Sequence, residues 1–322
     1  MPQCRYIRRD GSLCPEETHE ESLYCFWHDE KASKTGDDIK AKLEEKVKRD
    51  PNCEGYKLKK ARFHDVWLTE TNFNDADFSK ADLSSGHLFG ISLRGANLFK
   101  ANCSGANLRH AQLKESNLLG TNFENTKLGN VEWSADFVIL QELQGDILKK
   151  QGNRELARKK YKDAEEIYVA LKKHFDSVGD SDTVGKFFYR QMIVQRQQIP
   201  LLTLHRFFMK LADVSCGYGE KVGNIFSFSI FVIAFNALIY SFAGVIYGDH
   251  VFKITLHTSF PDMIRIYFKM LYYSTVTFTT LGYGEMTPIS TVSRFFAGIE
   301  AFMGAFLVAL FVIAVYKNLM SR

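Results

Sequence analysis

Apolar side chains recur at every fifth position between residues 61 and 135, and this is the clearest pattern along the chain. In units of five, the third position is apolar in all fifteen units and the first position is small or β-branched. A period of five fits neither the 3.6-residue repeat of a helix nor the two-residue alternation of a strand. The pattern therefore predicts a solenoid whose coils stack on one another. The third positions are Phe63, Leu68, Phe73, Phe78, Leu83, Leu88, Leu93, Leu98, Cys103, Leu108, Leu113, Leu118, Phe123, Leu128 and Trp133.

This five-residue pattern resembles that of the pentapeptide-repeat family. The resemblance implies a right-handed β-helix with four faces per coil, in which large third residues and small first residues fill a narrow interior. Fifteen units would give nearly four coils, stacked about 4.8 Å apart like neighbouring strands. Both ends of a solenoid need caps. We expect Trp133 and the helix after it to cap one end, and Phe63 with the basic segment before it to cap the other.

Two long apolar runs follow, at residues 225–247 and 295–316. The first run contains no Asp, Glu, Lys, Arg or His, and the second is interrupted only by Glu300. A helix as long as the first run spans roughly 34 Å, against a hydrocarbon core of about 30 Å. The two runs predict two transmembrane helices, and a buried core helix is the alternative for each.

Two membrane spans place both termini on the same side of the membrane. Basic residues gather on that side, whereas residues 248–291 balance three Lys or Arg against three Asp or Glu. The N-terminus has no apolar stretch typical of a signal peptide. We therefore expect a multi-pass protein of the plasma or inner membrane with both termini in the cytoplasm. The basic residues nearest the helix ends are Arg206, Lys210, Lys221, Lys317 and Arg322.

Residues 136–222 have the apolar periodicity of helices and predict a connector between the solenoid and the membrane. Apolar stripes at residues 164–175 and 184–192 predict an antiparallel helical hairpin. The stretch LLTLHRFFMKLADV, at residues 201–214, mixes large apolar and basic side chains. That composition is typical of a helix lying on the inner membrane surface, and packing on the hairpin is the alternative.

Residues 248–291, between the two apolar runs, are unusual for an external loop. They contain MIRIYFKMLYYSTVTFTTL, which is aromatic, rich in threonine and apolar. This run is too short and too interrupted to form a third span. A helix that enters the membrane halfway and returns as extended backbone would account for it.

Part of this segment, YYSTVTFTTLGYGEMTP at residues 272–288, resembles the pore helix and selectivity filter of potassium channels, with the filter form T-[VIL]-G-[YF]-G. The resemblance implies a pore helix at residues 267–279 and K⁺ bound by the backbone carbonyls of the first four filter residues and by the threonine hydroxyl. Because one chain supplies one filter strand, it also implies a homotetramer. The string GYGE also occurs at residues 217–220, where we expect a turn. The five filter positions are Thr280, Leu281, Gly282, Tyr283 and Gly284.

The same resemblance suggests which residues support the filter. Glu285 stands where the family usually has aspartate, and it would bond behind the filter to Tyr272 or Tyr273. Val276 occupies a position where some potassium channels carry a buried glutamate. Glu300 is the acid inside the second span, either as an intramembrane functional group or as a residue bonded behind the filter.

Three positions of the second span complete the resemblance to a channel. Gly304 lies twenty residues after Gly284 and matches the hinge glycine of the family's inner helix. Val308 and Val312 follow one and two turns further along the same face. The resemblance implies that these two side chains line the cavity or the gate.

The N-terminus contains a cysteine and histidine cluster, Cys4, Cys14, Cys25 and His28, with the spacing C-x9-C-x10-C-x2-H. Three thiolates and one imidazole can form a tetrahedral structural zinc site, and a short polar segment has few other means of folding. Reduced thiols in a loose tail are the alternative. No basic recognition helix follows, so we expect no nucleic-acid partner.

These patterns predict a multidomain membrane protein that performs no enzymatic chemistry. The expected function is a potassium-selective channel that conducts K⁺ passively as a homotetramer in the bilayer, assembled or gated through its cytosolic N-terminal part. The alternatives are a weakly selective cation channel, which Tyr283 disfavours, and a membrane-tethered pentapeptide-repeat scaffold. The predicted domains are a zinc-binding segment (1–35), a basic connector (36–60), a pentapeptide-repeat β-helix (61–135), a helical connector with an interfacial helix (136–222), and a two-span α-helical pore domain with a re-entrant pore loop (223–318).

Overall fold

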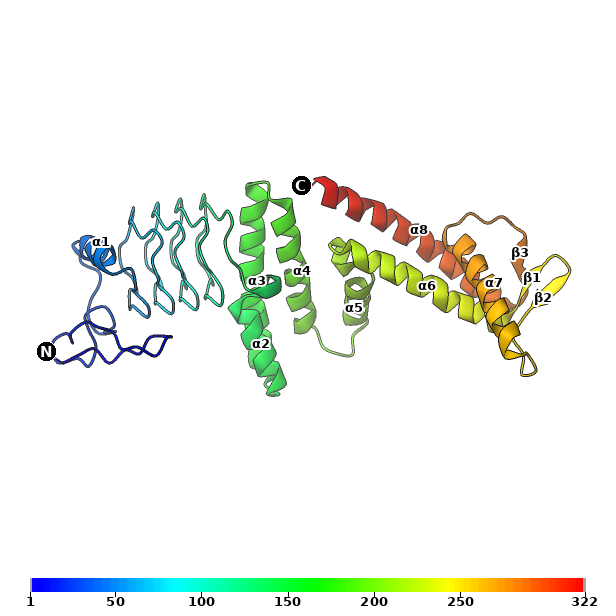
Figure 1. The fold of residues 1–322 in the computed structure, drawn as a ribbon, viewed down its shortest axis with the longest axis horizontal. Coiled ribbons are helices and arrows are strands. Elements are labelled where there is room, and N and C mark those ends of the chain that lie inside the picture. The colour runs from blue at the N-terminus through cyan, green and yellow to red at the C-terminus, as the bar shows by residue number, and fades with distance from the viewer. Residues whose placement is uncertain (1, 321–322) are drawn as a thin grey trace. The chain divides into compact units, whose positions relative to one another are not determined.

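The computed structural model describes residues 2–320, which divide into two compact units between Pro200 and Leu201 (Figure 1). The N-terminal unit contains stacked coils with helices after them, and the C-terminal unit contains long helices and a small sheet. Each unit has a hydrophobic core of its own. The two units are therefore described one after the other.

Parallel backbone pairing confirms the predicted solenoid. Bridges join residues that are 20 positions apart, from Asn52↔Asn72 to Gln112↔Glu132. One coil therefore comprises four five-residue units, and Figure 1 shows the coils stacked side by side. The third-position side chains are buried in every predicted unit up to residue 128. The period of five thus gives a closed apolar interior, as expected.

The solenoid begins earlier than predicted. Its pairing starts at Asn52, within the segment predicted as a basic connector, because buried Cys53 and Leu58 continue the apolar third position. The sequence pattern is obscured there because Tyr56 places a large ring at a first position, where a small residue is expected. At the end of the solenoid the ring has room, and it stacks on Trp27 with ring centroids 5.5 Å apart.

The N-terminal residues close the first coil. Residues 2–35 form a lobe held by short antiparallel bridges, and helix α1 (Ile39–Arg49) follows it. The Arg9 guanidinium donates to both carboxylate oxygens of Asp75 at 2.6 and 2.7 Å. The backbone N–H of Lys57 donates to the carbonyl of Trp27 at 2.8 Å. Side-chain and backbone bonds together fix the lobe on the solenoid.

Helices close the other end of the solenoid: α2 (Leu140–Lys150), α3 (Arg154–Ser177) and α4 (Ser181–Gln198). The ring of Trp133 packs edge-on against Phe187, with centroids 5.2 Å apart. Buried Glu142 accepts hydrogen bonds from Arg190 and from the hydroxyl of Tyr168. Burial raises the pKa of the Glu142 carboxyl above its ordinary value, against the opposing effect of Arg190. The predicted hairpin corresponds to α3 and α4.

The C-terminal unit is built around two long apolar helices, α6 and α8, that are long enough to cross a membrane. Helix α7 packs against both of them. The helices of this unit, in chain order, are α5 (Leu204–Cys216), the 3₁₀ turn η2 (Gly217–Gly219), α6 (Val222–Ala243), α7 (Phe260–Phe278) and α8 (Thr291–Met320).

The ends of these helices differ from the predicted ranges. The first span was predicted at residues 225–247, but α6 ends at Ala243 because Gly244 leaves the helical conformation with φ 93°. The predicted pore helix, residues 267–279, begins earlier because the side chain of Ser259 caps α7 and Pro261 lies in its first turn. The second span, predicted at residues 295–316, extends in both directions as α8.

A small sheet follows α6 and was not predicted. Strand β1 (Val245–Tyr247) pairs antiparallel with both β2 (His250–Phe252) and β3 (Met286–Pro288). Three residues are too few to show a two-residue alternation in the sequence. The sheet joins the segment after the predicted filter to the end of α6.

Helix α8 approaches the end of α7 unusually closely at Gly304. A Cβ atom at this position would lie only 1.9 Å from the backbone oxygen of Phe278 and 2.7 Å from its carbonyl carbon. Backbone atoms cannot give way as a flexible side chain can. Glycine is therefore required here for helix packing, in addition to the hinge role that the sequence predicts.

We expect Gly304→Ala to destabilise the C-terminal unit by about 1–3 kcal/mol or more, because α7 and α8 must separate to accept a methyl group. The measurement is thermal unfolding of the full chain in detergent. Gly298→Ala is the matched control, since a Cβ at Gly298 of the same helix meets no atom within 4 Å. Equal unfolding temperatures for the two variants would contradict the packing role.

Candidate functional site

The predicted filter residues connect the end of α7 to β3. Thr280, Gly282 and Gly284 have positive φ angles of 59°, 56° and 80°, whereas Leu281 and Tyr283 between them do not. This alternation suits a backbone whose successive carbonyls face one side, as a carbonyl-lined ion path requires. The side chains of Leu281 and Tyr283 are 61% and 67% exposed in the single chain. They are therefore available to neighbouring chains.

The two tyrosines predicted as filter supports have different partners. Tyr272 donates its hydroxyl hydrogen bond to Glu285, directly after the filter. Tyr273 is buried and packs edge-on against Tyr240, with ring centroids 4.9 Å apart. Of the two alternatives for Glu285, the structure brings Tyr272 to it. Val276 is half-buried, and its carbonyl accepts the backbone N–H of Leu281 at 3.1 Å.

Glu300 is fully buried at the place where three helices meet. The hydroxyl of Tyr240, on α6, donates to Glu300 Oε2 at 2.6 Å, and the hydroxyl of Ser274, on α7, bonds to Oε1. Ser274 also lies 2.8 Å from the carbonyl oxygen of Ile233. The carboxyl group thus joins α6, α7 and α8.

Sequence reasoning identified Glu300 but missed both of its partners. Ser274 and Tyr240 are polar residues inside apolar helical segments, and each is buried. That combination was the available signal, because buried polar groups need hydrogen-bond partners. What the sequence could not supply was the pairing across 60 residues between Tyr240 and Glu300.

The remaining predicted pore residues lie on α8. Gly304 packs against the end of α7, on the side of the helix that also carries buried Leu307. Val308 and Val312 are exposed in the single chain. These two valines are therefore free to face a central pathway formed with other chains.

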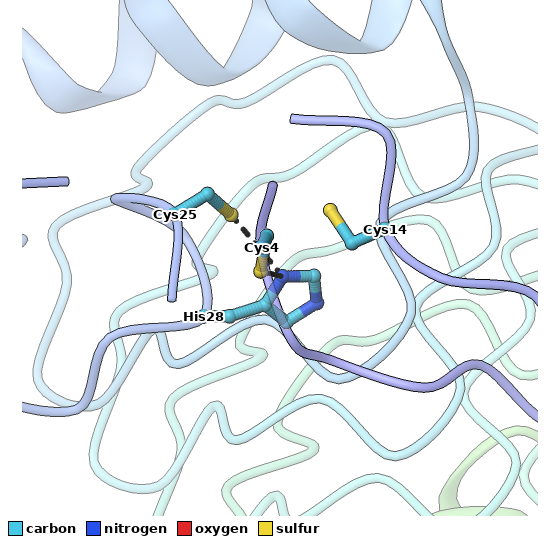
Figure 2. Close-up of side chains that lie close together, drawn as sticks. All are labelled: Cys4, Cys14, Cys25 and His28. Atoms are coloured by element: carbon cyan, nitrogen blue, oxygen red, sulfur yellow. Dashed lines mark hydrogen bonds between the residues drawn. The ribbon is translucent and has the colours of Figure 1, made fainter. Parts of the chain in front are cut away.

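The predicted metal ligands converge in the N-terminal lobe (Figure 2). One ligand atom from each of Cys4, Cys14, Cys25 and His28 lies within 4.8 Å of all the others, and all four residues are buried. The Nδ1 atom of His28 is 3.2 Å from Cys25 Sγ and 3.6 Å from Cys4 Sγ. Three sulfurs and one nitrogen at such distances could hold one tetrahedral metal ion.

The surroundings of His28 favour this use of its ring. Its Nε2 atom lies 2.7 Å from the backbone oxygen of Glu54, to which an N–H there would donate. With the proton on Nε2, the Nδ1 atom carries a lone pair on the side of the thiols, where it can bind a metal ion. The ring of Tyr6 stacks on the imidazole at 4.0 Å and fixes its plane.

The pKa values of two thiols in the cluster are shifted in opposite directions. A hydrogen bond from Cys25 holds the pKa of the Cys14 thiol well below its ordinary value. The pKa of Cys25 is raised, because its proton is shared with Cys14 and because it is buried. A thiolate is the form of cysteine that binds metal. The lowered pKa of Cys14 therefore favours the form that binds metal.

Comparisons with known proteins identify both parts of the chain. The family model described as ion channel matches residues 227–321. The model described as pentapeptide repeats matches residues 57–95 and 91–130, with eight copies. No curated protein matches the chain.

Solved structures similar to this chain cover its repeats. A pentapeptide repeat protein from the cyanobacterium Cyanothece 51142 is 33% identical over 26% of this chain and 57% of its own length, with a TM-score of 0.26. One from Nostoc Pcc 7120 is 20% identical over 31% of this chain and 97% of its own length, with a TM-score of 0.28. The chain thus spans little more than half of the first of these proteins.

These matches agree with the geometry of each unit. The channel match coincides with the two apolar helices, their connecting helix α7 and the segment after it, so the protein is a membrane protein. The repeat match coincides with the solenoid. The chain therefore carries an ion channel domain at residues 227–321, preceded by pentapeptide repeats, and both families are non-enzymatic.

Proposed function

We propose that the protein is a potassium-selective channel that conducts K⁺ passively as a homotetramer. The observation that carries the proposal is the alternating backbone at Thr280, Gly282 and Gly284, within a matched ion channel domain. Potassium must lose its water to pass a narrow filter, and aligned backbone carbonyls replace that water. In this proposal the ligands are the carbonyls of residues 280–283 and the hydroxyl of Thr280.

The surroundings of the filter support a cation pathway. The C-terminal end of α7 precedes the filter directly, and the carbonyl end of a helix carries partial negative charge. A single strand cannot surround an ion, so several chains must contribute. Four chains related by cyclic symmetry would bring four strands together, with Val308 and Val312 facing the cavity and Gly304 at the bend of the inner helix.

We propose that the channel lies in the plasma or inner membrane and that both of its termini lie in the cytoplasm. Basic residues on the termini side of the spans support this orientation. The large exposed apolar side chains of α5 support its place on the inner membrane surface. The N-terminal unit would then be a cytosolic part through which the channel assembles or is gated.

When K⁺ and Na⁺ concentrations differ across a liposome membrane that contains the protein, we expect a reversal potential close to the equilibrium potential of K⁺. Tyr283→Asp should shift it towards zero, because the carboxylate replaces the ring that holds the filter diameter. The matched control is Tyr218→Asp, which makes the same change in the other GYGE string and should leave the reversal potential unchanged.

Two other results would contradict this proposal and favour an alternative function. Equal permeability of the wild-type protein to K⁺ and Na⁺ would identify a weakly selective cation channel. Absence of any K⁺ flux, together with inhibition of a topoisomerase, would instead identify a membrane-tethered scaffold.

We further propose that Glu300 supports the filter from behind by holding α7 against α6 and α8. Glu300→Ala should accelerate the decay of current during sustained opening, because it leaves the buried Tyr240 hydroxyl without its acceptor and removes the bond between Ser274 and α8; such a loss costs about 1–3 kcal/mol. Glu300→Gln is the control, since its amide can bond to both hydroxyls and should keep slow decay. Identical decay in both variants would exclude the supporting role.

We propose that the cluster of Cys4, Cys14, Cys25 and His28 holds a structural zinc ion, because three thiolates and one imidazole suit this metal. Metal analysis of the purified chain should find about one zinc ion per chain. Cys25→Ser should lose the metal and make the lobe sensitive to protease, whereas Cys103→Ser, at a buried position inside the solenoid, should retain the metal. Unchanged zinc content in Cys25→Ser would refute the site.

A further inference from the structure

The first GYGE string, residues 217–220, forms a bend between α5 and α6 that we call the elbow. Gly217 ends α5 in the left-handed conformation with φ 54°, and Tyr218 follows with φ 55°. The backbone N–H of Lys221 donates back to the carbonyl of Cys216 at 3.3 Å. The chain thus reverses within a few residues, immediately before the first span.

Glu220, the last residue of the elbow, forms an ion pair with Lys317 near the end of α8. The two residues are 97 positions apart in the sequence. The Glu220 side chain is only 15% exposed and that of Lys317 is 43% exposed. The pair is therefore partly shielded from water, unlike an ordinary surface pair.

Lys317 continues the packed face of α8. Leu307, Leu310 and Ala314 belong to the apolar cluster between α6 and α8, and Lys317 lies one turn beyond Ala314 on the same side. The ion pair thus lies at the end of the apolar contact between α6 and α8. It fixes the last turns of α8 against the start of α6.

The elbow is also tied to α5. Cys216 belongs to the same apolar cluster as Leu307 and Ala314. The side-chain amide of Asn224, in α6, donates to the carbonyl of Asp213 in α5 at 3.3 Å. Movement of α5 would therefore reach α6 and α8 together.

The opposite side of α5 is apolar and exposed, at Leu204, Phe207, Phe208 and Leu211. These side chains have the i, i+3, i+4, i+7 spacing of one helical face. The adjoining α6 also exposes large apolar side chains, and that helix lies in an ion channel domain. The bilayer is the environment that both surfaces fit.

We infer that the Glu220–Lys317 pair positions the inner end of α8 and couples it to the membrane-surface helix α5. This inference rests on the proposed channel function. In a tetramer whose inner helices are α8, the pair holds the end of α8 against the outer helix and away from the central axis. Its loss would let α8 lean towards the axis and narrow the inner entrance.

Single-channel recording of the full chain in planar bilayers tests the inference. Glu220→Lys and Lys317→Glu should each lower the open probability several-fold, because each places like charges together. The double exchange should restore it, and Lys317→Arg should stay close to wild type. Single-channel current and reversal potential should not change, because the filter is untouched.

If a charge reversal prevents assembly, Glu220→Gln and Lys317→Gln serve as milder variants with the same expected direction. Unchanged or raised open probability in the single variants, or failure of the double exchange to restore it, would overturn the coupling while the wild-type K⁺ current upholds the channel function. A wild-type chain that passes no K⁺ would overturn both.

Discussion

In the proposed filter, a backbone that offers its carbonyls to an ion cannot use them in a helix or a sheet, and the surroundings of this segment meet that constraint. The segment at residues 280–284 has to be held by its surroundings. Before it, the N–H of Thr280 bonds to the carbonyl of Thr277, which continues the end of α7. After it, Glu285 bonds to Tyr272 and β3 pairs with β1. The irregular segment is thus fixed at both ends by regular structure.

The same constraint explains how α8 is used. On its packed face, Glu300 accepts hydrogen bonds and Gly304 makes a close backbone contact. Leu307 and Ala314 make apolar contacts, and Lys317 forms an ion pair. These five residues lie on one side of the helix. In the proposed tetramer, the side that carries the exposed valines would face the other chains.

The sequence predicted best the features that repeat or that depend on neighbouring residues. The five-residue period specified the solenoid because every unit faces the same narrow interior, and long apolar runs specified α6 and α8. The predicted start of the solenoid was too late because Tyr56 interrupts the five-residue pattern in the first coil. A large ring is accommodated there because it stacks on Trp27. The end of α6 was misplaced because a glycine conformation and a short strand outweigh apolar composition.

Contacts between distant residues were the part that the sequence could not supply. Glu300 stood out as an acid in an apolar run, but its partners on α6 and α7 are single polar residues without a pattern. The pair of Glu220 with Lys317 has no local signal, because each residue alone is an ordinary charge at a helix end. By contrast, the cluster of Cys4, Cys14, Cys25 and His28 was predictable because three thiols and one imidazole are a ligand set that suits zinc.

The two GYGE strings show how the surroundings decide a conformation. In the first string Gly217, Tyr218 and Gly219 all have positive φ, and three such residues in succession form a tight bend. In the second string Gly282 and Gly284 have positive φ, but Tyr283 does not. Tyr218 adopts the left-handed conformation, which is unfavourable for a residue other than glycine, and so closes the elbow. Tyr283 lies in an alternating backbone, and its side chain is exposed in the single chain. One string thus forms a turn and the other an alternating backbone that suits the proposed ion path.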